Sequence, residues 1–275
     1  MDNATTYWNQ LNETKNWLKN LGIQPQCGVV LGTGMHALLD RVEIIQSISY
    51  NEIPNFQLST VESHKGNLVY AKLGEKFLLI MQGRFHFYEG YSMQQIVFPV
   101  RVMKLLGIRH LLLTNAAGGM NLDYKKGDLV LIDDHLNMQS TNPLTGANIN
   151  ELGARFPDMS QPYSTDINSI FLQKAKELNI PLRKGIYVSV NGPNLETRAE
   201  YRWLRNTGAD MVGMSTVPEV IAANHMGLPC AAISVITDEC DPENLKPVNI
   251  QEIIEAAGKA DQKLAELLKV AIQAL

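Results

Sequence analysis

An alternation of short apolar runs with longer amphipathic segments constrains the fold of this chain more than any other feature. Apolar runs typical of buried strands lie at 27–31, 110–114, 128–133, 186–190 and 231–237, with a short strand around Met211. Segments with helical spacing of apolar residues lie at 5–21, 92–106, 166–178, about 196–206, 217–226 and about 249–273. Strands that alternate with helices predict an α/β fold with a largely parallel sheet.

Two segments carry further local signals. Residues 67–72 and 76–81 flank Gly74 and predict a hairpin. Pro99 lies inside the 92–106 segment and is expected to kink or divide that helix, because proline removes a backbone donor.

The chain is predicted to form a single domain over residues 1–275. Its length of 275 residues fits one large α/β domain, and no internal repeat, low-complexity tract or composition break divides it. Residues 136–164 show no clear periodicity. A loop of that length inside a compact domain is usually functional or contacts a partner.

Charge and cysteine usage exclude several classes of protein. Lysine and arginine total 24 against 28 aspartates and glutamates, a net charge of −4 without a long basic run, so nucleic acid and membrane surfaces are excluded as partners. Cys27, Cys230 and Cys240 are scattered, which predicts neither a disulfide framework nor a zinc site. The amino terminus lacks a signal-like segment, and no apolar run reaches the roughly 18 residues that span a bilayer. We therefore expect a cytoplasmic protein.

Small and polar residues recur where the predicted strands end, and ligands bind at that edge of an open α/β sheet. Gly32, Thr33 and Gly34 follow the first buried strand, where backbone N–H groups can converge on an anion and Thr33 adds a hydroxyl. A plain strand-to-helix turn is the alternative. The dinucleotide-binding fingerprint is met only in its looser form, because Ala37 stands at the third glycine position.

Residues 82–89 directly follow the strand 76–81 and carry convergent polar side chains. In an extended chain, Arg84, His86 and Tyr88 would share one face. Arginine offers a planar fork for phosphate, histidine offers a second donor, and Glu89 is placed to orient His86. The alternative is a polar turn with two aromatic core residues.

Three other strand ends are candidates. The tiny side chains of residues 115–119 permit close backbone approach to a ligand. These residues are too small and glycine-rich for the interior of a helix or strand, so a packed turn is expected. Glu196 opens a helix, where a carboxylate is commonly a favourable dipole contact. Ser215 precedes another helix, where it can donate to an anion or merely cap.

These segments, taken in order, resemble the trimeric purine nucleoside phosphorylase family. The matching motifs are GTG (32–34), HKG (64–66), MQGRFHFYEGY (81–91), FPVR (98–101), TNAAGG (114–119), DHLN (134–137), NPLTG (142–146), RFPDMS (155–160), GPNLET (192–197) and GADMVGMSTVPEV (208–220). The resemblance implies reversible phosphorolysis of purine (deoxy)nucleosides to free purine and (deoxy)ribose 1-phosphate. It also implies a homotrimer, a mixed sheet partly closed into a barrel and flanked by helices, and no metal or organic cofactor, with phosphate as co-substrate.

The resemblance also implies a role for particular residues. Phosphate would be held by Thr33, His64, Arg84, His86, the Ala116 backbone and Ser215. The nucleoside would be held by Tyr88 and Met214 at the ribose, by Leu195 and Val212 on either side of the base, and by Glu196 at the purine N1–H and any 2-amino group. Phe156 would cover the sugar in a neighbouring subunit's site. The residues expected to carry catalysis are His86, Glu196 and Asp238.

Three positions depart from the family pattern. Asp238 stands where vertebrate-type members carry asparagine, and an ionised aspartate accepts hydrogen bonds but does not donate them. We expect Asp238 to broaden the site toward adenosine or to make the preference strongly pH-dependent; the alternative is one acid of a solvated cluster with Glu239, Asp241 and Glu243. No histidine occupies residues 248–251, which leaves the ribose 5′-hydroxyl unassigned, and Leu195 replaces the usual phenylalanine.

Four other functions compete with this interpretation. A phosphorylase of methylthioadenosine is disfavoured by Glu196, which that relative lacks. A nucleoside hydrolase would release base without phosphate. A non-catalytic nucleoside-binding or storage protein is disfavoured by the joint presence of Arg84, His86, Glu196 and Ser215. A dinucleotide-dependent dehydrogenase rests only on the looser glycine fingerprint.

Overall fold

The computed structural model describes residues 3–58, 65–245, 247 and 249–275, without the side chains of Asn3 and Ile250. The helices are α1 (Asn3–Asn20), α2 (Met93–Leu105), α3 (Thr165–Glu177), α4 (Arg198–Asn206), α5 (Val217–His225) and α6 (Ile250–Ala274). The strands are β1 (Cys27–Leu31), β2 (Glu43–Ser49), β3 (Asn67–Leu73), β4 (Lys76–Gln82), β5 (His110–Gly119), β6 (Leu129–Asn137), β7 (Leu182–Ser189), β8 (Met211–Gly213) and β9 (Cys230–Glu239). Short 3-10 helices are η1 (Ala37–Arg41), η2 (Tyr50–Glu52) and η3 (Phe87–Glu89).

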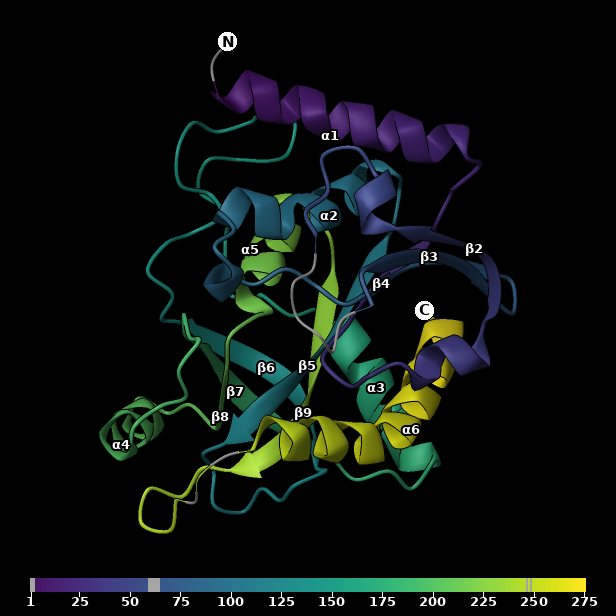
Figure 1. The fold of residues 1–275 in the computed structure, drawn as a ribbon. Helices are drawn as coiled ribbons and strands as arrows, with labels where there is room; N and C mark the ends of the chain where they lie inside the picture. Colours follow the sequence, from purple (N-terminus) through teal and green to yellow (C-terminus); the bar gives the residue numbers. More distant parts are fainter. Residues whose placement is uncertain (1–2, 59–64, 246, 248) are drawn as a thin grey trace.

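One mixed sheet organises the molecule (Figure 1). Its strand order is β2-β3-β4-β1-β5-β8-β7-β6-β9, and β9 pairs back onto β5. Strands β5, β8, β7, β6 and β9 therefore close into a ring, while β1 to β4 continue the sheet outward from β5. The central pairs β1–β4, β1–β5 and β5–β9 are parallel, whereas β2–β3 and β3–β4 are antiparallel. The expected α/β fold with a partly closed mixed sheet is confirmed.

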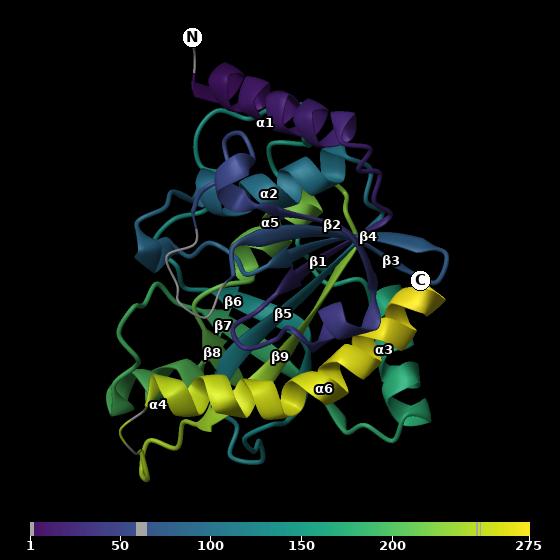
Figure 2. The same cartoon turned by 45° about the vertical axis from the view of Figure 1, so that its right-hand side comes forward.

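Two layers of helices cover the sheet. Helix α1 packs on α2, and α2 packs on α5, while α3 and α6 pack together on the other side (Figures 1 and 2). The last helix, α6, buries an apolar stripe that includes Ala257, Leu264, Leu267 and Leu268, each at most 2% exposed. Burial of these side chains supplies the main favourable free energy of docking α6 onto the sheet.

The structure differs from the sequence predictions at three places. Residues 115–119 are not a turn but the end of β5, because β9 and β8 supply backbone partners as far as Gly119. Helix α2 runs undivided through Pro99. Strand β2 was not predicted, because its half-exposed sequence has no two-residue alternation of burial.

The remaining elements agree with the sequence predictions to within a few residues. The hairpin is confirmed as β3 and β4, which pair from Asn67 with Gln82 to Leu73 with Lys76. All three cysteines are free and buried. Within the described ranges, no helix is long and apolar enough to cross a membrane.

Candidate active site

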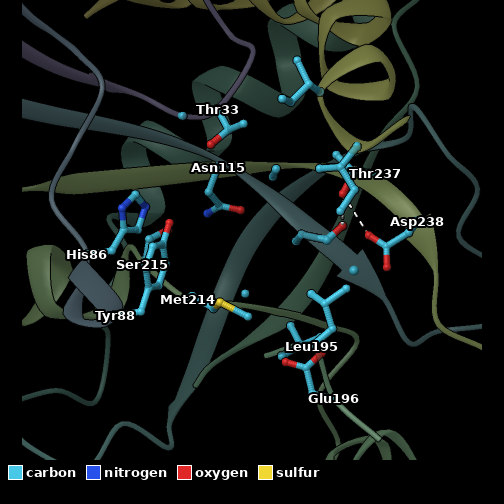
Figure 3. Close-up of a pocket in the computed structure, with 18 of the residues that line it drawn as sticks. Thr33, His86, Tyr88, Asn115, Leu195, Glu196, Met214, Ser215, Thr237 and Asp238 are labelled. Atoms are coloured by element: carbon cyan, nitrogen blue, oxygen red, sulfur yellow. Dashed lines mark hydrogen bonds between the residues drawn. The ribbon is translucent and has the colours of Figure 1, made fainter. Parts of the chain in front are cut away.

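A pocket opens where the carboxyl ends of β1, β4, β5 and β9 meet β8 and α4 (Figure 3). This is the edge at which ligands bind in α/β sheets. The sequence-predicted residues that line it are Thr33, Arg84, His86, Tyr88, Ala116, Leu195, Glu196, Val212, Met214, Ser215 and Asp238. The fold therefore brings together residues that are up to two hundred positions apart in the chain.

Arg84 is the only arginine or lysine lining the pocket within the described part of the chain, and it is 1% exposed. Its Nη1 donates to Ser215 Oγ at 3.0 Å and to Thr216 Oγ1 at 3.2 Å. Its Nε lies 3.4 Å from Glu219 Oε1 in an ion pair whose side chains are 2% and 3% exposed. This pairing offsets part of the cost of burying the guanidinium charge.

The start of α5 adds donors beside Arg84. Ser215 and the N-cap residue Thr216 lie between β8 and α5, whose N-terminus carries partial positive charge. Thr216 has a φ of 70°, a conformation that costs a non-glycine residue roughly 1–3 kcal/mol and that clusters at functional sites. The Glu219 carboxylate accepts from the Thr216 N–H at 3.0 Å and holds this turn in place.

Asn115 belongs to the same hydrogen-bond network. Its Nδ2 donates to Thr216 Oγ1 at 2.9 Å, while its Oδ1 accepts from Ser234 Oγ at 2.8 Å. A Cβ at Gly32 would lie 2.8 Å from the Asn115 Cα, so only glycine lets β1 approach β5 this closely. The backbone of β1 and β5 is therefore brought to the pocket wall. Thr33, Arg84, His86 and Ser215 form what we call the cationic end of the pocket.

His86 is oriented by Glu89, as predicted. The Glu89 Oε1 accepts from the backbone N–H of His86 and lies 2.9 Å from its Nδ1. Burial lowers the pKa of His86, and the hydrogen bond to Glu89 opposes that shift. The neutral ring thus carries its proton on Nδ1, which leaves Nε2 as the basic nitrogen.

Tyr88 reaches the pocket by a different route from the one predicted. Residues 87–89 form η3, so the chain is not extended there and the two-residue alternation does not apply. The Tyr88 ring instead stacks on His86, with ring centroids 4.7 Å apart and an interplanar angle of 14°.

The opposite end of the pocket is acidic, and we define it by Leu195, Glu196, Tyr201 and Asp238 (Figure 3). Burial raises the pKa of Glu196, a hydrogen bond from Tyr201 lowers it, and the charge of Asp238 raises it again. Burial also raises the pKa of Tyr201 strongly. The two carboxyl groups therefore interact across one end of a cavity whose other end is cationic.

Asp238 is not simply one acid of a solvated cluster. Its neighbours are engaged outside the pocket: Glu239 with Lys125, Asp241 with Asn244, and Glu243 with Arg202. Asp238 instead lines the pocket and accepts from Thr237 Oγ1 and Cys240 Sγ.

Two predicted residues do not lie in this pocket. His64 lies outside the described residues. Phe156 is 88% exposed and borders a separate hollow with His135 and Met159, beneath the stacked guanidinium of Arg155. Its expected role in a neighbouring subunit stays a prediction.

Sequence reasoning missed several residues of the site. The lining also includes the side chains of Asn115, Tyr201, Thr237, Ile253 and Ile254. The prediction for residues 115–119 concerned the backbone alone, so it gave the Asn115 side chain no role. Thr237 and Tyr201 carry no local signal, because their importance depends on contacts with distant residues.

The sequence and the fold of this chain are both similar to those of known proteins. A family model described as the phosphorylase superfamily matches residues 26–273. The chain is 48% identical over 254 residues to purine nucleoside phosphorylase 1 of Bacillus subtilis (strain 168), covering 92% of this chain and 94% of that protein. Solved schistosoma purine nucleoside phosphorylases, one in complex with hypoxanthine and one from Schistosoma mansoni in complex with adenosine, each superpose with a TM-score of 0.92. Both are 36% identical to this chain and match over 97% of each chain.

Proposed function

Since the chain belongs to the phosphorylase superfamily, among its purine nucleoside phosphorylases, we propose that the pocket carries out reversible phosphorolysis of purine (deoxy)nucleosides. A nucleoside and phosphate give free purine and (deoxy)ribose 1-phosphate. The observation that carries this proposal is the polarity of the pocket: a buried arginine with hydroxyl donors at one end and two carboxyl groups at the other.

The cationic end would bind phosphate. Arg84 supplies the planar guanidinium, Thr33 and Ser215 supply hydroxyls, and the start of α5 supplies its partial positive charge. The backbone of Ala116, His86 and, from the resemblance, His64 would complete the set. Because Glu219 already balances part of the Arg84 charge, the site would bind phosphate with moderate affinity and could release it.

The acidic end would bind the purine. The carboxylate of Glu196 would accept from the purine N1–H, while Leu195 and Val212 would contact the faces of the base. Met214 lies between the two ends and Tyr88 lies beside His86, and together they would contact the ribose. No metal or organic cofactor is part of the proposal, and phosphate is the co-substrate.

The geometry suits bond exchange at the sugar carbon C1′. The C1′–N9 bond breaks and its electron pair leaves with the purine, while a phosphate oxygen forms the new bond to C1′. Phosphate at the cationic end would stabilise positive charge on the sugar, and hydrogen bonds at the acidic end would orient the departing base. Holding phosphate and sugar in line supplies the orientation contribution.

Asp238 makes both 6-oxo and 6-amino purines candidate substrates. Inosine and guanosine present a 6-oxo group, whereas adenosine presents an amino group that a carboxylate can accept from. We propose activity on inosine and guanosine, with adenosine accepted through Asp238. The free purine produced fits a role in purine salvage, and the three reduced, buried cysteines fit the cytoplasm.

The experiment that tests the function measures base release from inosine, guanosine and adenosine, with and without phosphate. Phosphate-dependent release is expected for a phosphorylase. Release without phosphate would identify a hydrolase instead, and binding without release would identify a storage protein. Preference for methylthioadenosine over all three would contradict the role given to Glu196.

Phe156 supports a homotrimer in which each subunit completes a neighbour's site. At 88% exposed, Phe156 is the most exposed large apolar side chain among the described residues, and the 138–164 segment that carries it contains no helix or strand. Phe156→Ala should raise the KM for nucleoside several-fold and leave the KM for phosphate unchanged. Sedimentation measures the assembly directly, and a monomer with unchanged KM would contradict the proposal.

A further inference from the structure

Asp238 has both carboxylate oxygens engaged by side chains of its own segment. Thr237 Oγ1 lies 3.0 Å from Oδ1 (dashed in Figure 3), and Cys240 Sγ lies 3.0 Å from Oδ2. The cysteine is 1% exposed and Thr237 is 2% exposed, so neither donor exchanges freely with water. The carboxyl group is therefore held in one orientation at the acidic end.

A β-bulge in β9 creates this arrangement. In the parallel pairing of β5 with β9, Ala117 lies opposite Ile236 but Gly118 lies opposite Asp238, so Thr237 is the extra residue. Successive side chains of a regular strand point to opposite faces. The bulge breaks that rule and lets Thr237 and Asp238 both line the pocket.

Gly118 leaves the space that the cysteine and the carboxylate occupy. A Cβ at this position would lie 2.6 Å from Cys240 Sγ and 3.3 Å from Asp238 Oδ2. The glycine-rich end of β5 thus has a specific role here, since any larger residue would push the thiol off the carboxylate.

The two donors to Asp238 differ in chemistry. The Thr237 hydroxyl also lies 3.4 Å from the Ala117 carbonyl, and it has one proton to give. The shorter of the two distances, 3.0 Å to Asp238 Oδ1, favours donation to the carboxylate. The Cys240 thiol is a donor and only a weak acceptor, so it too favours Asp238 as the acceptor.

Cys240 is also linked to the other carboxyl group of the pocket. Burial and the neighbouring Asp238 raise the pKa of Cys240, so it stays a protonated thiol at neutral pH. Hydrogen bonds of Tyr201 with Cys240 and with Glu196 contribute to the pKa values of these groups. Tyr201 therefore lies close to both Glu196 and Cys240, and the charge of Asp238 itself helps to raise the pKa of Glu196.

Resting on the proposed phosphorolysis, we propose that Thr237 and Cys240 are positioning residues that set the choice between 6-amino and 6-oxo purines by holding the Asp238 carboxylate as a hydrogen-bond acceptor at the acidic end. An ionised Asp238 accepts from a 6-amino group. A protonated Asp238 donates to a 6-oxo group or to N7. Neither positioning residue needs to touch the reacting atoms.

The charged groups around Asp238 are mainly acidic, so its hydrogen-bond donors are the neighbouring Thr237 and Cys240. The titratable and charged groups that face it from the packed elements are Glu196, Tyr201, Lys126, Glu252, Glu239, Asp241 and Cys240. The Nζ atom of Lys126 lies 3.8 Å from Oε2 of Glu252. Because that cation is already paired with another acid, the donors that hold the Asp238 carboxylate are the thiol and the hydroxyl.

The test compares kcat/KM for adenosine and inosine in wild type, Cys240→Ala and Cys240→Ser across the acid and neutral pH range. Cys240→Ala should lower the adenosine-to-inosine ratio about tenfold, the effect of losing one hydrogen bond to a charged group. Cys240→Ser keeps a donor and should restore the ratio. Cys27→Ala is the matched control, since it removes a buried thiol from β1 outside the pocket.

Thr237→Val provides a second variant that acts on the other oxygen. It should also lower the ratio, and Thr237→Ser should restore it. Calorimetric binding of free adenine and hypoxanthine measures the same preference without turnover, so a slow variant remains informative. Unchanged ratios in both Cys240→Ala and Thr237→Val would overturn the inference. A wild type that releases no base with phosphate would instead overturn the proposed function.

Discussion

Arg84 at the cationic end is 1% exposed and contacts Glu219 and two hydroxyls, whereas Glu196 and Asp238 at the acidic end are only partly buried. Among the described residues, neither acid is within ion-pair distance of a cation. The charge of Arg84 is thus partly balanced by Glu219 before any ligand binds. The acidic end is not, and a bound purine would supply the missing hydrogen-bond donors.

The two ends also differ in how they are built. The cationic end draws on β1, β4, β5 and α5, and contacts such as Arg84 with Thr216 span 132 positions of sequence. The donors to Asp238 are its own neighbours, Thr237 and Cys240. A substitution at the cationic end therefore disturbs several elements, while one at the acidic end changes local hydrogen bonding. Specificity can change there at little cost in stability.

The largest expected effect is at the centre of the cationic end. Arg84→Met should lower kcat/KM about 10³-fold, because it removes the donor closest to the proposed phosphate. It should also lower the free energy of unfolding by about 3–5 kcal/mol, since Glu219 is left buried without its cation. Steady-state kinetics and thermal unfolding measure the two effects.

A double variant separates these two consequences. Arg84→Met combined with Glu219→Gln removes the uncompensated charge and should recover much of the stability but none of the activity. If activity returned with stability, Arg84 would act only through folding, and the proposed phosphate site would be wrong.

The next largest effect is expected at the acidic end. Glu196→Gln should lower kcat/KM for inosine about 10²-fold, because the carboxylate that would accept from N1–H is replaced by a neutral amide. The KM for phosphate should stay near the wild-type value. Glu200→Gln, an exposed glutamate of the same helix start, is the control. An equal rise in the KM for phosphate would show that the two ends are not independent.

The sequence predicted the alternation of elements well, because apolar runs and helical stripes reflect burial directly. It failed at residues 115–119, whose side chains do not favour a strand. The backbone ladder with β9 decides the conformation there, and that partner is about 120 positions away. Likewise, the extended-chain argument for Tyr88 failed because the capping contact of Glu89 with His86 closes a 3-10 turn.

The family resemblance identified the pocket residues that belong to motifs. Among the described residues, the fold brings all of them together except Phe156. The resemblance gave no signal for Thr237, Cys240 or Tyr201. Their significance comes from a bulge that inserts one residue in β9 and from a glycine that leaves room for a thiol. Such features depend on strand register, which no local pattern in this chain specifies.

A smaller effect is expected from the residue that orients His86. Glu89→Gln keeps the size of the side chain but weakens its hold on Nδ1, so both tautomers of His86 become populated. We expect kcat/KM to fall about tenfold and the pH profile to change shape, since burial already lowers the pKa of His86. A pure rise in the KM for nucleoside, with an unchanged profile, would contradict this positioning role.

The smallest expected effect is on the free energy of unfolding. Removing the charge of Glu196 should raise it, whereas removing the charge of Arg84 should lower it. Burial raises the pKa of Glu196 in the folded protein above its usual 4.5. Its contribution to stability is therefore fully present below the unfolded pKa and is lost as the pH rises through the folded pKa. Glu196→Gln should then be about as stable as wild type in acid and more stable than wild type at neutral pH.

Thermal unfolding of both proteins across that pH range measures the difference. Because the same substitution is expected to lower activity, a gain in stability would show that Glu196 is kept ionised at a cost, as a binding group rather than a structural one. Arg84→Met should lose stability under the same conditions. If Glu196→Gln were instead destabilising at neutral pH, the acidic end would be as fully balanced as the cationic end, and the contrast between them would fail.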